Sequence, residues 1–578
     1  MSKPLLQVKN LSIDFIETNG ISNAVKNISF NVGKGEILAI VGESGSGKSV
    51  TALSLMQLLP MQSVVTGQLL FCNKNIVPTD LLKISNKEIH TIRGKEMAMI
   101  FQEPMTSLNP VLTCGYQVME AIILHQKVTT KIAKEKTVAL FEKVNLPEPA
   151  KMIDRYPHQL SGGQKQRIMI AMAMSCNPSL LIADEPTTAL DVTVQKTILE
   201  LIKSLQMQTG MGVIFITHDL GLVADIADRL LVMYKGEIIE QGITKEVLQN
   251  PQQAYTKALL ACRPTMHQRG ERLPVVSDFF NVSNQSDLSK LNVIASPKIK
   301  AENEYFSQEK NTPEIVLIVD NLKVYYPGKK QLLRNTPEPF KAVDRVSFTV
   351  NKGETVGLVG ESSCGKTTLG RAILQLIPTT GGHIMLNGKD LTQLTKKQLQ
   401  IVRKDLQIVF QDPYGSLNPR LMIGNAIIEP MQVHGMLNST KERKEKVIEL
   451  LEKVNLSADH FNRYPHQFSG GQRQRICIAR ALALNPSFLI FDESVSALDV
   501  SVQAQVLNLL NDLKKEFKFT SIFISHDLAV VRYISDRILV MNKGQIIEQG
   551  LADDVYFKPQ NEYTKKLIDA IPGKQIFS

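Results

Sequence analysis

The sequence predicts an α/β protein made of two tandem copies of one domain, and three observations carry this prediction. Long motifs recur in the same order in both halves, such as "RYPHQLSGGQKQRIMIA" from Arg155 and "RYPHQFSGGQRQRICIA" from Arg463. Continuous apolar runs such as "EILAIVG", "MAMIFQ", "SLLIADE" and "GVIFITHD" are typical of parallel strands buried on both faces. Helical patterns such as "VTVQKTILELIKSLQMQ" lie between these runs, and this alternation indicates a doubly wound core in each copy.

The domain boundaries follow from the repeat. A chain of 578 residues is too long for one core, and the repeat is far longer than that of a solenoid, so each copy should have a core of its own. The stretch between the copies contains Pro274, Pro297 and Pro313 among many Ser, Asn and Lys, without sustained periodicity. We therefore expect a first domain over 1–263, a flexible linker over 264–313 and a second domain over 314–578.

Composition narrows the class of partner. The chain has 66 Lys+Arg and 56 Asp+Glu, a net charge of +10. It has no basic block interleaved with aromatics, so we expect a solvated surface rather than a nucleic-acid groove. The start "MSKPLLQVKN" does not resemble a signal peptide, and no run of about 18 apolar residues is present to span a bilayer. We expect a cytosolic protein, or one docked on a membrane from the cytosolic side.

The first half contains a phosphate-binding loop. "GESGSGKS" matches G-x-x-x-x-G-K-[ST] between a strand-like run and a helical one. Backbone N–H groups of such a loop and the following helix N-terminus bind phosphate, the lysine reaches the β- and γ-phosphates, and the last hydroxyl binds Mg²⁺. The predicted ATP-binding residues are Gly42, Glu43, Ser44, Gly45, Ser46, Gly47, Lys48 and Ser49, with Ser49 also a metal ligand.

The second half repeats this loop as "GESSCGKT", in which one glycine is missing. Ser363 stands where the first loop has Gly45, and if that position needs a positive φ, serine costs on the order of 1 kcal/mol of strain. The lysine and final hydroxyl are kept, so we expect binding to survive. The predicted residues are Gly360, Glu361, Ser362, Ser363, Cys364, Gly365, Lys366 and Thr367, with Thr367 also a metal ligand.

Paired acids end one apolar strand in each half, in "LLIADE" and "FLIFDE". The first acid of each pair, Asp184 or Asp492, suits a Mg²⁺ site next to the loop hydroxyl. The second acid, Glu185 or Glu493, is placed to act as general base on an attacking water.

Two further polar residues follow strands at matched places. Gln102 and Gln411 come after "MAMIF" and "LQIVF", where their amides could contact Mg²⁺ or the water. His218 and His526 follow "GVIFIT" and "SIFIS", within reach of a γ-phosphate, and we expect them to be catalytic.

A further glycine motif opens one helix in each half. A serine followed by two glycines at a helix N-terminus can bind an anion, and the same serine is also an ordinary N-cap; both descriptions can hold together. The residues are Ser161, Gly162, Gly163, Gln164 in "LSGGQ" and Ser469, Gly470, Gly471, Gln472 in "FSGGQ".

These motifs, in this order and over nearly the whole chain, resemble the nucleotide-binding domain of ABC transporters. The resemblance implies two P-loop NTPase ABC cassettes in tandem, each a RecA-like core with a helical subdomain. It implies that the cassettes pair head to tail, with each ATP between one phosphate loop and the other half's signature, and that Asp191 and Asp499 communicate between the sites. It also implies an aromatic ring on adenine, for which Phe15 and Tyr326 are the candidates.

The subfamily is indicated by "RYPHQ" and by the tails "NPQQAYTKALL" and "KPQNEYTKKLI". They are similar to the ATPases of oligopeptide, dipeptide and nickel importers, and the fusion narrows the resemblance to glutathione-import and microcin/peptide-import ATPases. This implies ATP hydrolysis with Mg²⁺, coupled to peptide or glutathione import. It implies two inner-membrane permease subunits, an extracytoplasmic binding protein, and a peripheral place on the cytoplasmic face.

One alternative class remains open from the sequence. Twin-cassette ATPases that act on ribosomes or nucleic acid also lack membrane spans. Such proteins usually carry a long, charged helical arm between the cassettes, which a linker dotted with Pro and Asn does not provide.

Overall fold

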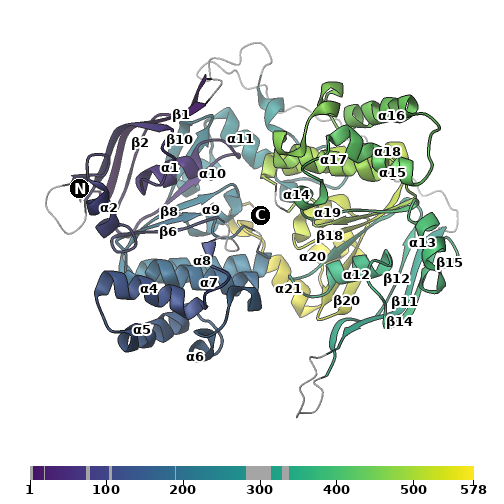
Figure 1. The fold of residues 1–578 in the computed structure, drawn as a ribbon, viewed down its shortest axis with the longest axis horizontal. Coiled ribbons are helices and arrows are strands. Elements are labelled where there is room, and N and C mark those ends of the chain that lie inside the picture. The colour runs from purple at the N-terminus through teal and green to yellow at the C-terminus, as the bar shows by residue number, and fades with distance from the viewer. Residues whose placement is uncertain are drawn as a thin grey trace.

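The chain is described by a computed structural model, in which two halves lie side by side (Figure 1). The structure describes residues 4–17, 20–72, 78–102, 107–188, 190–280, 314–327, 338–496 and 498–577. Within these ranges no helix is both long and apolar enough to cross a membrane.

Each half contains one antiparallel and one mostly parallel sheet. In the first half the antiparallel sheet has the order β2-β1-β4-β5 and the larger sheet the order β10-β9-β3-β8-β7-β6. Strands β3, β6, β7, β8 and β9 pair in parallel, and β10 pairs antiparallel to β9. The strands are β1 (Leu6–Glu17), β2 (Gly20–Val32), β3 (Ile37–Val41), β4 (Ser63–Phe71), β5 (Thr79–Asp80), β6 (Met97–Ile100), β7 (Leu180–Asp184), β8 (Gly212–Thr217), β9 (Arg229–Tyr234) and β10 (Glu237–Ile243).

Helices of the first half cover the parallel sheet and form a separate helical layer from α4 to α7. The helices are α1 (Lys48–Leu55), α2 (Asn86–Ile92), α4 (Cys114–Gln126), α5 (Thr130–Lys143), α6 (Pro149–Met152), α7 (Gly162–Ala173), α8 (Val192–Thr209), α9 (Leu220–Ile226), α10 (Thr244–Gln249) and α11 (Ala254–Ala261). Short 3-10 turns are η1 (Pro157–Gln159), η2 (Met174–Cys176), η3 (Pro264–Met266) and η4 (Val276–Phe279).

The second half repeats this plan, with sheet orders β12-β11-β14-β15 and β16-β17-β18-β13-β19-β20. Its strands are β11 (Ile315–Tyr326), β12 (Phe340–Asn351), β13 (Thr355–Val359), β14 (Gly381–Leu386), β15 (Lys389–Asp390), β16 (Leu406–Val409), β17 (Phe488–Asp492), β18 (Thr520–Ser525), β19 (Arg537–Asn542) and β20 (Gln545–Leu551). Its helices are α12 (Lys366–Ile373), α13 (Lys396–Val402), α14 (Pro413–Ser416), α15 (Ile423–Val433), α16 (Thr440–Lys453), α17 (Gly470–Leu482), α18 (Val500–Phe517), α19 (Leu528–Ile534), α20 (Ala552–Phe557), α21 (Glu562–Asp569) and α22 (Lys574–Phe577), with 3-10 turns η6 (Leu391–Gln393), η7 (Ala458–Asn462) and η8 (Pro465–Gln467).

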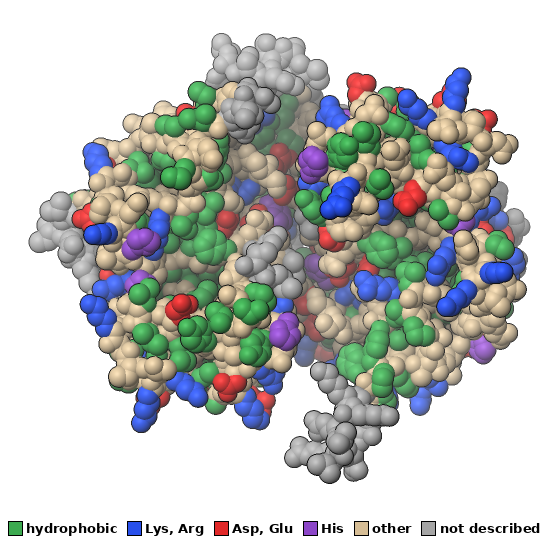
Figure 2. Space-filling model, viewed as in Figure 1, with side chains coloured by type: hydrophobic (Ala, Val, Ile, Leu, Met, Phe, Trp, Pro, Cys, Tyr) green, Lys and Arg blue, Asp and Glu red, His purple; other side chains and the backbone are tan. Residues whose placement is uncertain are grey.

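The predicted fold class is confirmed. The strands β3, β7 and β8 are buried along their whole length, because in a doubly wound sheet both faces are covered and continuous apolar runs satisfy both. In Figure 1 the helical layer lies at the bottom of the first half but at the top of the second, so the halves are oppositely oriented. Lys and Arg side chains are spread over both halves on the face that Figure 2 shows.

The first part of the predicted linker differs from the expectation of flexibility. Over 264–280 the chain packs against the second half: Leu273 is fully buried, and its N–H and C=O bond the side chain of Asn508 at 2.9 and 2.8 Å. Tyr533 donates its hydroxyl proton to the Glu271 carbonyl at 2.6 Å. Apolar residues such as Val276 and Phe279 supply burial that outweighs the Pro and Ser around them. Residues 281–313 lie outside the described part of the chain.

The contact is reciprocal, because the C-terminal end of the chain returns to the first half (Figure 1). The Gly573 N–H donates to Asp225 in α9 at 3.1 Å, and Arg263 donates to the Pro572 carbonyl at 3.0 Å. Buried apolar side chains from both halves form one continuous cluster here, including Val223, Leu259, Leu273, Tyr533 and Ile571. The halves are therefore joined by packing as well as by the peptide chain.

Candidate functional site

Each phosphate loop connects a buried strand to a helix that starts at the loop lysine. After β3 the backbone of Gly42 has φ 154°, and a Cβ there would lie 2.2 Å from the Met233 carbonyl oxygen, so only glycine fits. Lys48 is buried and donates from Nζ to the carbonyls of Gly42 and Glu43 at 2.7 and 2.8 Å. These bonds hold the ammonium group across the loop.

The second loop has the same geometry. Lys366 donates to the carbonyls of Gly360 and Glu361 at 2.7 and 2.9 Å. Ser363 has φ 67° where Gly45 has φ 80°, so this position does require a left-handed backbone in both loops. A Cβ at Gly45 would meet nothing within 4 Å, so the cost of serine is backbone strain alone, on the order of 1 kcal/mol.

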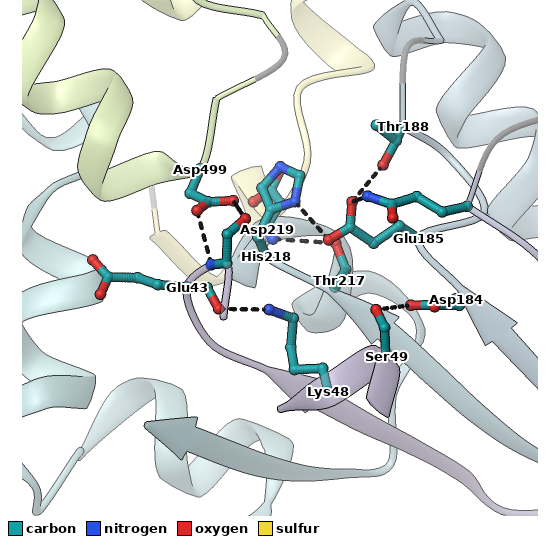
Figure 3. A network of polar contacts seen from close by, with 12 residues as sticks. Glu43, Lys48, Ser49, Asp184, Glu185, Thr188, Thr217, His218, Asp219 and Asp499 are labelled. Atoms are coloured by element: carbon teal, nitrogen blue, oxygen red, sulfur yellow. Dashed lines mark hydrogen bonds and ion pairs between the residues drawn. The ribbon is translucent and has the colours of Figure 1, made fainter. Parts of the chain in front are cut away.

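The carboxylates of the first half converge on the first phosphate loop, 42–49 (Figure 3). Ser49 donates to Asp184 at 3.0 Å, which brings the two predicted metal ligands together. Glu185 accepts from the Gln102 amide at 3.0 Å and from Thr188 at 2.9 Å, and its other oxygen lies 3.3 Å from Nδ1 of His218. The acid, amide and imidazole predicted from separate motifs therefore form one cluster.

Burial and hydrogen bonding shift the pKa values of the two neighbouring acids, Asp184 and Glu185, in opposite directions. Burial raises the pKa of Asp184 to about 6, against the opposing effect of the Ser49 hydroxyl. Burial also acts to raise the pKa of Glu185, but hydrogen bonds from His218 and Thr188 outweigh it and lower that pKa to about 2. Glu185 also has φ 47°, a left-handed conformation that is costly for a residue with a Cβ.

The second half reproduces this cluster, except that His526 faces the same carboxylate oxygen as Gln411 and that one hydroxyl bonds differently. Thr367 donates to Asp492 at 3.0 Å, and Glu493 accepts from Gln411 at 2.8 Å and lies 3.4 Å from Nδ1 of His526. Ser496 occupies the place of Thr188, but it donates to the backbone carbonyl of Glu493, at 2.8 Å, and not to the carboxylate. Glu493 therefore has one fewer side-chain donor than Glu185.

The two signature motifs begin α7 and α17. Ser161 accepts from the Gln164 N–H, and the Gln164 side chain accepts from the Ser161 N–H, which makes a capping box; Ser469 and Gln472 repeat it. The N-cap role expected for these serines is therefore confirmed. Among the described residues, the hydrogen bonds from one half to the other's phosphate loop come instead from the segments around Asp191 and Asp499.

Those two aspartates each precede a long helix, which Asp191 alone caps with its side chain, and both reach across to the other half. Asp499 accepts from the N–H and hydroxyl of Ser44 at 2.8 and 3.0 Å, and Asp191 accepts from the Ser362 N–H at 3.3 Å. Ser501 also donates to the carboxylate of Glu43. Each loop therefore contacts the N-terminal end of a helix in the opposite half.

The candidate adenine residues occupy different environments. Phe15 is half-buried and Tyr326 is 44% exposed. Across the strands Tyr326 pairs with Phe340, which is 63% exposed and lines a cavity of about 390 Å³ with Ser362 and Cys364 of the second loop. Phe340 was not predicted, because neither its exposure nor its place beside the loop can be read from the sequence.

Two tyrosines of the tails were also missed as site residues. Tyr255 in α11 and Tyr563 in α21 accept hydrogen bonds from the N–H groups of Glu43 and Glu361, at 3.1 and 3.0 Å. The sequence reasoning used the tails only as family marks. Nothing in their local sequence indicates that they reach a phosphate loop.

Comparison with known proteins shows matches over both halves of the chain. A family model described as "ABC transporter" matches residues 25–188 and 343–496, and one described as "Oligopeptide/dipeptide transporter, C-terminal region" matches 239–278. The chain is 48% identical to the glutathione import ATP-binding protein GsiA of Pectobacterium atrosepticum, over 99% of this chain and 90% of that protein. It is 49% identical to the protein of that name from Escherichia coli O157:H7, over 98% and 89%.

These relatives are importer subunits, so they give no support to the ribosome-acting alternative. The ABC transporter model matches once in each half, and each match covers a phosphate loop, a pair of acids and a signature. The chain therefore belongs to the ABC transporter family, as an ATP-binding protein with two fused cassettes.

Proposed function

We propose that the chain hydrolyses ATP at two sites to power an importer for peptide-class solutes. The observation that carries the proposal is the duplicated cluster in which Glu185 or Glu493 lies between an amide and an imidazole beside a phosphate-loop lysine. The names of the relatives, which describe import, support the coupling to transport.

The oxygen donors beside each loop fit Mg²⁺, which prefers hydroxyl, carboxylate and amide oxygens. Ser49, Asp184 and Gln102 would hold it in the first half, and Thr367, Asp492 and Gln411 in the second. Bound Mg²⁺ would supply charge neutralisation at the phosphates. Phe15 in the first half, and Tyr326 with Phe340 in the second, would contact adenine through their π faces.

The remaining roles belong to side chains of the chain itself. Lys48 and Lys366 would face the terminal phosphates. With a pKa of about 2, the Glu185 carboxylate is ionised at neutral pH, so it can orient the attacking water and accept its proton. His218, whose pKa is raised by Glu185 against the effect of burial, would fix that carboxylate through Nδ1 and turn its other ring nitrogen to the phosphates. Glu493 and His526 would act in the same way.

We further propose head-to-tail pairing within the chain, over cassettes 1–263 and 314–578. Each ATP would lie between one phosphate loop and the other half's signature, which are 161–164 and 469–472. The opposite orientation of the halves and the bonds of Asp499 to Ser44 and of Asp191 to Ser362 support this pairing.

The names of the relatives, which mention glutathione import, support the solute and partners that we propose. We propose glutathione as the solute, two inner-membrane permease subunits that bind near Gln102 and Gln411, and an extracytoplasmic solute-binding protein. The chain would then lie on the cytoplasmic face of the inner membrane as a peripheral subunit.

The test is the ATPase rate of the purified chain, alone and with its neighbouring permeases in lipid. We expect the rate to rise with the permeases and again with a binding protein loaded with glutathione. The Glu185→Gln/Glu493→Gln double variant is the control and should lose turnover while it still binds ATP. An ATPase rate that does not change with permeases but rises with ribosomes would overturn the proposal.

A further inference from the structure

The two C-terminal tails each place one tyrosine hydroxyl against a phosphate loop. Tyr255 lies in the first turn of α11 and Tyr563 in the first turn of α21. Their oxygens accept hydrogen bonds from Glu43 N–H at 3.1 Å and Glu361 N–H at 3.0 Å. Glu43 and Glu361 directly follow the first glycine of each loop, so the same bond occurs at the same place in both halves.

The tyrosine of the first half is held firmly. Tyr255 is 2% exposed, and its ring centroid lies 4.4 Å from that of Tyr234, at the end of β9. Burial raises the pKa of both tail tyrosines, so each hydroxyl stays neutral. A neutral, immobilised hydroxyl accepts the hydrogen bond of a loop N–H. Without it this N–H would lack a partner, which costs free energy when the group is buried.

The same two glutamates are also held from the opposite half. The Glu43 carboxylate accepts from Ser501, and Glu361 accepts from Thr193 at 2.8 Å. The start of each loop is thus fixed by its own tail through the backbone, and by the other half through the side chain.

The tails themselves contact the opposite half. Lys196 in α8 donates to the carbonyl of Asp569, at the end of α21, at 3.2 Å. The segment that follows α11 packs on α19, where Tyr533 bonds Glu271. A change in how the halves meet would therefore reach each tail, and through it the loop.

We propose that Tyr255 and Tyr563 are positioning residues that fix the start of each phosphate loop and link nucleotide affinity to the docking of the tails. This inference rests on the proposed role of the loops in ATP binding. It assigns to the tails a task at the nucleotide sites themselves, separate from any task at the membrane.

The experiment compares Tyr255→Phe, Tyr563→Phe and the double variant with the full wild-type chain. Each change removes only the hydroxyl and keeps the ring. Hydrogen–deuterium exchange without nucleotide should become faster in peptides that cover 42–46 or 360–364 of the altered half. The KM for ATP should rise about three- to tenfold in the double variant, the size of effect that loss of one neutral hydrogen bond per site gives.

Thr137→Val is the matched control, because it removes another buried hydroxyl, which donates to the Ala133 carbonyl at 2.8 Å within α5 of the helical layer. It should lower thermal stability but leave loop exchange and KM unchanged. Unchanged exchange in both tail variants, or a control that raises KM equally, overturns the inference. Hydrogen–deuterium exchange measures how firmly the tyrosines hold the loops and needs no nucleotide. Failure of the wild-type chain to bind ATP would therefore refute the proposed function separately.

Discussion

Asp499 of the second half accepts two hydrogen bonds from Ser44 of the first, from its N–H at 2.8 Å and from its hydroxyl at 3.0 Å. The reciprocal pair is weaker, since Asp191 accepts only the Ser362 N–H, at 3.3 Å. The two loops are therefore not equally tied to the opposite half.

This inequality predicts unequal effects of removing the two aspartates. We expect Asp499→Ala to lower ATP turnover at least about tenfold, because loss of hydrogen bonds to a charged acceptor costs roughly 1.5–3 kcal/mol. Asp191→Ala should lower it less. Steady-state kcat of both variants is the measurement, and a larger loss with Asp191→Ala would contradict the prediction.

The left-handed position in the loops predicts opposite effects of a reciprocal exchange. Ser363→Gly should stabilise the chain by less than about 1 kcal/mol, since relief of about 1 kcal/mol of strain slightly exceeds the 0.4–1 kcal/mol or so that glycine adds to unfolded-state freedom. Gly45→Ser should destabilise by a similar amount, as its Cβ meets no neighbour. Urea unfolding monitored by circular dichroism tests both, and a stabilising Gly45→Ser would show the argument to be wrong.

The hydroxyl next to the proposed general base differs between the halves. Thr188→Ala removes a donor to the Glu185 carboxylate and should lower kcat about three- to tenfold in a Glu493→Gln background, where only the first site turns over. The matched change is Ser496→Ala in a Glu185→Gln background, which should have a smaller effect because Ser496 bonds a backbone carbonyl. Equal losses would mean that the two hydroxyls do not differ as described.

The contact of the first tail with the second half predicts a stability difference between two arginines. Arg269 bonds Asp536, and both side chains are about three-quarters buried, with 24% and 25% exposed. Arg269→Ala should destabilise by about 1–3 kcal/mol, because it leaves part of the Asp536 charge uncompensated. Arg272→Ala, from an exposed pair with Asp512 at 3.3 Å, should cost about 0–1 kcal/mol. Thermal unfolding of the two variants decides, and the reverse order would refute the assignment.

The reactivity of Cys262 tests the same contact between the first tail and the second half. Burial raises the pKa of Cys262 to about 12, so its thiol remains protonated at pH 8 and should react slowly with iodoacetamide. Cys176 is partly exposed and should react sooner. Peptide mass spectrometry of timed samples measures both rates. Equal rates would indicate that the region around Cys262 opens readily in solution.

Much of this architecture follows from local sequence. The strands β3, β7 and β8 are continuous apolar runs, and parallel topology brings their carboxyl ends to one edge, so Asp184, Glu185 and His218 had to lie near the loop. The bonds of Tyr255 to Glu43 and of Asp499 to Ser44 could not be predicted in the same way. They join residues far apart in the chain, and only the packing of the tails and of the two halves sets them.

The segment 264–280 shows the limit of composition as a guide. Its Pro and Ser residues are typical of flexible linkers, yet Leu273, Val276 and Phe279 are buried. A few apolar side chains at a short spacing were the available signal. Without knowledge of the surface that the second half offers, that signal could not be told from chance.

The exchange of C-terminal segments between the halves also fixes how the molecule responds to dilution. A pair of separate cassettes meets at a rate set by their concentration, whereas here each half carries the other at a constant effective molarity, on the order of millimolar for tethered partners. Specific activity should therefore stay constant down to nanomolar protein.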